Sequence, residues 1–95
     1  MDEIASLPVR RLHYLQLCDA LAERPRDTAT LLHQARAERL MPGDGALDLR
    51  GLLRAVPRDL PISVEIPMDA LARTVPAVER ARRILAKTRQ LLAAV

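Results

Sequence analysis

The sequence predicts an α/β fold in which two parallel strands are connected through helices. Two short apolar runs, over about residues 9–18 and 61–66, have the character of buried strands. Helical spacing occupies much of the chain between these runs and most of the chain after them. Strands that are joined through helices are expected to run parallel, with a right-handed crossover.

The first strand and the first helix occupy the N-terminal half of the chain. Side chains alternate along the strand predicted over residues 9–18, so Gln16 and Cys18 share one face. The helix is predicted over residues 28–40, because Asp27 is a favourable N-cap and apolar residues follow it at helical spacing.

A loop and a short helix precede the second strand. Residues 41–45 contain a proline and two glycines, a composition typical of a tight turn. The short helix is predicted over residues 48–56, between the capping Asp48 and the helix-stopping Pro57. The second strand, over residues 61–66, is β-branched and bordered by prolines.

The last predicted helix covers residues 75–94. Thr74 is expected to cap this helix, and Pro76 falls in its first turn, where a proline is tolerated. One apolar stripe is expected to pack on the sheet, with the arginines on the solvated face. The stripe consists of Val78, Ala81, Ile84, Leu85, Thr88, Leu91 and Leu92.

Two parallel strands cannot bury their own surfaces. Both faces and both edges of such a pair need partners. The 95 residues include a single aromatic side chain, Tyr14, whereas a self-sufficient core usually contains several large side chains. We therefore expect residues 1–95 to be part of one larger α/β domain, either an open sheet or a barrel.

The composition indicates a cytoplasmic protein. A single cysteine, Cys18, excludes an internal disulfide and favours a reducing compartment. No apolar run approaches the roughly 20 residues of a membrane helix, and we expect no secretory signal. The net charge of +3 comes from arginine, which we interpret as compositional bias rather than as a signal for anion binding.

Two polar side chains lie near the C-terminal ends of the predicted strands, Gln16 on the first and Glu65 on the second. In β/α barrels the chemistry gathers where strand ends meet the following loops. Amide and carboxylate oxygens suit a divalent cation. Because an unpaired buried carboxylate is costly, Glu65 must lie at an exposed strand end, be paired or bind a metal. For Gln16 the alternative is a hydrogen-bonded residue of the core.

Three motifs in this order give the chain a family resemblance. They are LQLCDA at residues 15–20, RLMPGDG at 39–45 and PISVEIP at 61–67. With these motifs the chain resembles the xylose isomerase-like TIM barrels, the sugar phosphate isomerases and epimerases, from about Asp2 to Leu92. The resemblance implies that residues 1–95 are the last two or so βα units of a (β/α)8 barrel, a fold of about 250 residues.

The resemblance also implies a site and a reaction. One divalent metal ion (Mn, Mg, Co or Zn) would be bound by Gln16 and Glu65, with two further ligands on strands that this chain lacks. Glu65 would transfer a proton next to the carbonyl of a small sugar or hydroxy-keto substrate. Arg39 would contact the substrate. Apart from the resemblance, Asp19 lies at the strand end, where it could contact the substrate or a residue that supports the site, or could help to close the loop. With half of the ligands missing, the 95-residue piece alone is expected to be inactive.

Two other classes of function remain open. The chain could be a non-catalytic interaction module that completes a partner's sheet, by docking onto the missing N-terminal barrel strands or by pairing with a second copy. The basic C-terminal helix could instead bind nucleic acid through phosphates. Nucleic acid is not the expected partner, because the chain has no aromatic stacking platform and its arginines fit a solvated helix face. No membrane partner is expected.

Overall fold

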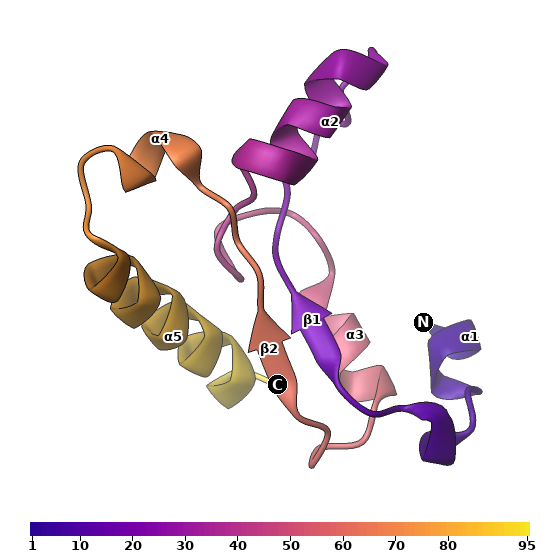
Figure 1. The fold of residues 1–95 in the computed structure, drawn as a ribbon. Coiled ribbons are helices and arrows are strands. Elements are labelled where there is room, and N and C mark those ends of the chain that lie inside the picture. Colours follow the sequence, from indigo (N-terminus) through magenta and orange to yellow (C-terminus); the bar gives the residue numbers. More distant parts are fainter.

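A two-stranded parallel sheet forms the centre of the computed structural model, which describes residues 1–95 (Figure 1). Strand β1 comprises Leu15–Leu17 and strand β2 comprises Ile62–Val64. Leu15 is the register partner of Ile62, so the two strands run side by side and end together. The protein is therefore α/β with parallel strands, as the sequence predicts.

Both strands are shorter than predicted. Residues 9–11 form a 3-10 helix that begins after Pro8, and β1 starts only where β2 lies opposite. Beyond the sheet, the extended residues 38–40 pair with Asp19 on one side and with Met68 on the other. Residues 38–40 therefore lie between the segment that follows β1 and the segment that follows β2. The direct pairing of β1 with β2 ends where residues 38–40 come between them.

Two helices cover one face of the sheet. Helix α3 (Leu49–Ala55) and helix α5 (Ala77–Ala93) contribute leucines to a small core that β1 completes. The buried members of this core are Leu17, Leu49, Leu53 and Leu91. The other face of the sheet has no helix on it and is turned toward the viewer in Figure 1.

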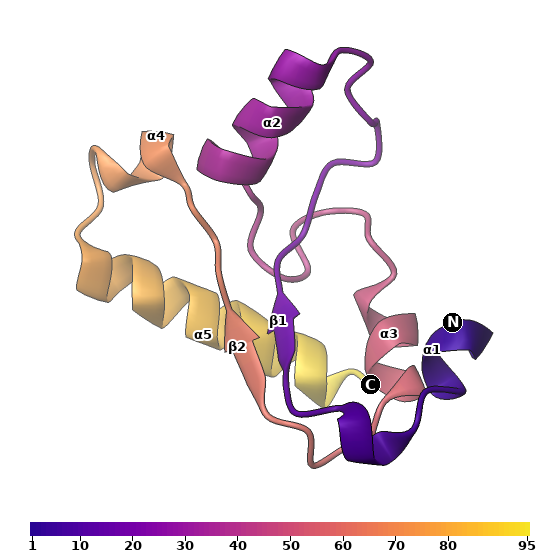
Figure 2. The ribbon, with the colours of Figure 1, turned by 45° about the vertical axis from the view of Figure 1, so that its right-hand side comes forward.

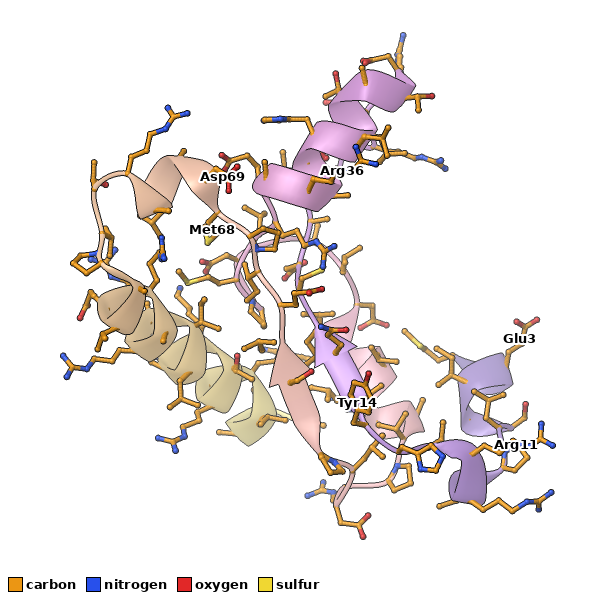
Figure 3. The ribbon with its side chains drawn as sticks, viewed as in Figure 1. Glu3, Arg11, Tyr14, Arg36, Met68 and Asp69 are labelled. Atoms are coloured by element: carbon orange, nitrogen blue, oxygen red, sulfur yellow. The ribbon has the colours of Figure 1, made fainter.

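The remaining helices lie at the two ends of the sheet. Helix α1 (Asp2–Ala5) packs near α3, whereas helix α2 (Thr28–Ala37) stands clear of α3 and α5 at the opposite end (Figure 2). Helix α4 (Asp69–Ala72) begins beside the C-terminal end of α2, where Figure 3 labels Met68 and Asp69. None of the five helices combines the length and hydrophobicity needed to cross a membrane.

Side-chain caps explain where the middle helices begin. Asp27 accepts a hydrogen bond from the Thr30 N–H at 2.8 Å, and Asp48 accepts one from the Gly51 N–H at 2.9 Å. The backbone hydrogen bond from Thr30, followed by that from its hydroxyl, lowers the pKa of Asp27. Both helices begin where their caps predict, but α2 ends at Ala37, three residues before the predicted end.

Helix α5 departs from the prediction in its cap and in its buried face. Pro76 is the N-cap, and the Thr74 hydroxyl donates instead to the Leu71 carbonyl of α4 at 3.4 Å. Of the predicted stripe, Thr88 and Leu91 are buried and Ile84 is half-buried. The other large members of the predicted stripe, Val78, Leu85 and Leu92, are exposed.

The molecule exposes more surface than a folded monomer of its mass usually does. Its accessible surface is 7018 Å², whereas a compact 10.6 kDa protein exposes about 5,500 Å². The radius of gyration is 14.4 Å, against about 12.4 Å for a compact domain of this length. Ten of the 95 residues are buried, so the core is small and substantial faces remain uncovered.

Candidate functional site

Asp19 anchors the C-terminal end of β1 to the glycine-containing loop. Its carboxylate is 2 % exposed and accepts four backbone hydrogen bonds. Oδ2 accepts from the N–H groups of Gly43 and Gly45, each at 3.0 Å. Oδ1 accepts from Leu47 N–H at 3.1 Å and from Ala20 N–H at 2.8 Å. The charge is thus balanced by oriented peptide dipoles rather than by a basic side chain.

The loop around Asp19 needs glycine at two positions for different reasons. Gly43 has a φ of 92° and follows Pro42 in a turn closed by Asp44 N–H to Met41 carbonyl at 2.9 Å, a type II arrangement that favours glycine. A Cβ on Gly45 would overlap the Ala20 carbonyl and the Asp19 carboxylate. The sequence therefore permits the backbone to close around the carboxylate.

Gln16 and Glu65 project from the open face of the sheet. Gln16 is the register partner of Ser63, and Glu65 lies two residues further along the second chain, where side-chain alternation returns to the same face. Glu65 remains aligned, because its N–H donates to the Leu17 carbonyl at 3.3 Å. Strand spacing and rise place the two Cα atoms about 8 Å apart. Both side chains are exposed.

Arg39 connects the end of α2 to Glu65. Its Nη1 lies 3.4 Å from Glu65 Oε2 and donates to the Glu65 carbonyl at 3.3 Å, while Nε donates to the Ala35 carbonyl at 2.6 Å. The arginine and glutamate side chains are 30 % and 60 % exposed, so solvent screening limits the ion pair to roughly 0.2–1 kcal/mol. The contact positions the two groups more than it stabilises the fold.

A hollow of about 450 Å³ lies between α2 and the chain that follows β1. Its lining is mostly apolar and includes Leu21, Leu31 and Leu40, with Arg39 and Glu38 among its polar residues. The Glu38 carboxylate is engaged elsewhere, since it accepts the Ala70 N–H of α4 at 3.0 Å. Arg39 is the one basic side chain among the residues that line this hollow.

The structure brings three of the four predicted site residues to one region and gives the fourth a different environment. Gln16 and Glu65 share the open face, and Arg39 contacts Glu65. Asp19 is buried, and backbone N–H groups occupy both of its oxygens. Of the roles that the sequence leaves open for Asp19, these contacts support loop closure.

The metal expected at this face would find only part of a coordination shell. Gln16 and Glu65 supply suitable oxygen donors, but a catalytic zinc site, for example, uses three protein ligands. No group of three or more histidine, cysteine, aspartate or glutamate side chains is arranged to hold a metal ion. The residues present therefore fit half of such a site.

The sequence does not reveal two contacts that fix this end of the molecule. Lys87 of α5 donates to Asp44 Oδ1 at 2.6 Å and fastens the glycine loop to the helix. The Arg39–Glu65 contact joins residues 26 positions apart. The cluster of turn residues at 41–45 indicates a loop, but not which side chains will bind it.

Comparisons of the chain with protein-family models, with curated proteins and with solved structures find no match.

Proposed function

We propose that residues 1–95 carry half of a divalent-metal site in a sugar or sugar phosphate isomerase or epimerase, as the C-terminal βα units of a (β/α)8 barrel. The observation that carries the proposal is the register of the sheet. It places Gln16 and Glu65 on the same helix-free face of two adjacent parallel strands. In a barrel the helices cover the outer face, and active sites form at the C-terminal strand ends.

The proposal assigns the remaining ligands to strands outside residues 1–95. Two oxygen donors are too few to hold a catalytic ion firmly, and β1 and β2 each have an unpaired outer edge where further strands would add. The 95-residue chain alone should bind a divalent ion weakly and should not catalyse the reaction. We also propose that the protein acts in the cytoplasm.

Each residue at the site has a separate task in the proposed reaction. The bound ion would polarise the carbonyl and hydroxyl oxygens of the substrate. Glu65 would accept and return the proton on the carbon next to the carbonyl, within hydrogen-bond reach of the substrate. Arg39 orients the Glu65 carboxylate through Nη1, and its planar fork can also donate to a substrate oxygen.

Paramagnetic broadening by Mn²⁺ tests the half-site on the chain as it exists. Because broadening is detectable even for weak binding, the side-chain amide signals of Gln16 should disappear first as Mn²⁺ is added. Those of Gln90, an exposed amide on α5, serve as the internal control. Glu65→Gln should remove the selective effect, whereas the exposed Glu3→Gln on α1 should leave it unchanged.

Equal broadening of Gln16 and Gln90, or an unchanged effect in Glu65→Gln, would contradict the metal half-site. Activity provides the second criterion. In an assembly that supplies the missing strands, Glu65→Gln should lower the rate of aldose–ketose or epimer interconversion by roughly 10²–10⁴-fold, the usual contribution of a positioned acid–base group.

The second candidate function is an interaction module that completes a partner's sheet. The observation that favours it is the surplus of exposed surface, together with the unpaired strand edges. A purely structural module would not require Gln16 and Glu65 to share a face. Selective broadening of the Gln16 amide signals by Mn²⁺ would therefore favour the metal site over the interaction module.

A further inference from the structure

Helix α5 carries an apolar row that nothing in the protein covers. Val78, Leu85 and Leu92 are 65 %, 49 % and 41 % exposed. They are spaced seven residues apart, and seven residues make about two helical turns, so the three side chains lie along one side of the helix. The buried side chains of α5, Thr88 and Leu91, belong to a neighbouring row.

This apolar row continues toward β2. Leu92 also lines a cavity of about 240 Å³ together with Leu60, Ile62 and Val95. Figures 1 and 2 show α5 alongside β2 with no other helix on its outer side. The end of the row at Leu92 therefore adjoins an apolar hollow, whereas Val78 and Leu85 extend the row along the exposed side of the helix.

Positive charge borders the row. Arg82 and Arg89 lie three or four residues from Leu85, and both border it on the side of the helix away from Thr88 and Leu91. Arg89 forms no ion pair, and Arg82 is 76 % exposed with a single carboxylate contact, to Glu79 at 3.9 Å. These two guanidinium groups are available to acids on a partner.

We propose that the Val78–Leu85–Leu92 row of α5 is the docking site for an amphipathic helix of a partner protein, whose apolar stripe is bordered by acidic side chains. The whole molecule exposes about 1,500 Å² more than a compact monomer of its mass, and the row on α5 is one part of that uncovered surface; a specific interface requires about 800 Å² from each partner. An acidic border would complement Arg82 and Arg89 and set the register of docking.

A second copy of the chain is a poorer match for the same row. Antiparallel self-pairing centred on Leu85 would place Arg82 of one copy beside Arg89 of the other, on both sides of the two-fold axis. Like charges at such positions disfavour association. The proposal does not depend on the metal half-site, since none of these residues lies on the open sheet face.

Two designed helical peptides of the length of α5 provide the probe. Both have the same leucine stripe, bordered by glutamates in one and by lysines in the other, and binding to the full chain is measured by fluorescence anisotropy. The glutamate peptide should bind at least about tenfold more tightly than the lysine peptide. Leu85→Gln should weaken binding by a similar factor, as expected for a central interface residue.

Matched variants distinguish docking from nonspecific adhesion. Leu32→Gln alters a leucine that is 42 % exposed on α2 and should leave the affinity unchanged. The double change of Arg82→Glu with Arg89→Glu should reverse the preference to the lysine peptide. Equal binding of both peptides, or unaltered binding by Leu85→Gln, would overturn the proposal, as would a dimer in light scattering that Leu85→Gln dissociates. The Mn²⁺ effect at Gln16 should be unaffected by Leu85→Gln, so the two proposals fail separately.

Discussion

Replacing Asp19 with asparagine should destabilise the protein far more than an ordinary surface change. Asparagine has nearly the same shape as aspartate, but one of its two terminal groups is an NH₂ donor. In either amide orientation that donor would face two backbone N–H groups, those of Gly43 and Gly45 or those of Leu47 and Ala20. The change therefore replaces two accepted hydrogen bonds with two donor–donor contacts.

The magnitude follows from the number of N–H groups that lose their acceptor. Each buried donor left unsatisfied costs about 1–3 kcal/mol, so the loss of two acceptors in Asp19→Asn should lower the free energy of unfolding by about 2–6 kcal/mol. A protein of this length has about 5–14 kcal/mol in total. Urea titration followed by far-ultraviolet circular dichroism measures the difference.

Asp59→Asn is the matched control, because Asp59 is exposed in the turn before β2 and its side chain makes no hydrogen bond or ion pair. It should change the free energy of unfolding by less than about 0.5 kcal/mol. If Asp19→Asn were as mild as this control, the assignment of Asp19 as the anchor of the loop would be refuted.

Three further changes probe other parts of the fold. Gly45→Ala should destabilise more than Gly43→Ala in the same urea titration, because a Cβ on Gly45 overlaps neighbouring atoms whereas Gly43 has open space and only an unfavourable φ, worth roughly 1 kcal/mol. Since the pKa of Asp27 is lowered below its ordinary 3.8, the cap on α2 is intact above that value. Its contribution is lost as the pH falls through the folded pKa, so amide shifts of α2 recorded from about pH 5 to about pH 2 should show fraying, and Asp27→Asn should abolish that pH dependence. Leu53→Ala truncates a buried side chain and should lower the free energy of unfolding by about 2–5 kcal/mol, whereas the exposed Leu32→Ala should change it little. Equal effects of the two changes would contradict the assignment of Leu53 to the core.

Local signals predicted the helices better than the strands. The caps Asp27 and Asp48 act on the residues that immediately follow them, so the starts of α2 and α3 could be read from the sequence. A strand exists only where a partner lies opposite, and the partner of Leu15 is Ile62. The extent of β1 therefore depends on contacts between distant segments, which alternation alone does not determine.

The same limit applies to the site and to α5. The positions of Gln16 and Glu65 in the two apolar runs predicted that they lie near the strand ends, and the register gives them a common face. The burial of Asp19 depends on a loop that begins more than 20 positions later in the chain, and no local pattern identifies it. Helical periodicity predicts an apolar stripe on α5, but which part of that stripe is covered depends on the elements available to cover it. Here only one side of α5 has a neighbour, and Val78 and Leu85 remain in solvent.

The carboxylate-bound loop also has a consequence for the order in which the chain folds. Register partners in the sheet are separated by 47 positions, whereas Asp19 reaches Gly43 over 24. The entropy lost on closing a loop grows with the logarithm of its length, so the shorter closure is favoured by about 0.6 kcal/mol for each halving. Once Asp19 holds Gly43 and Gly45, fewer than half of the intervening residues still separate the two strands. We therefore expect the loop to be captured by Asp19 before β1 pairs with β2.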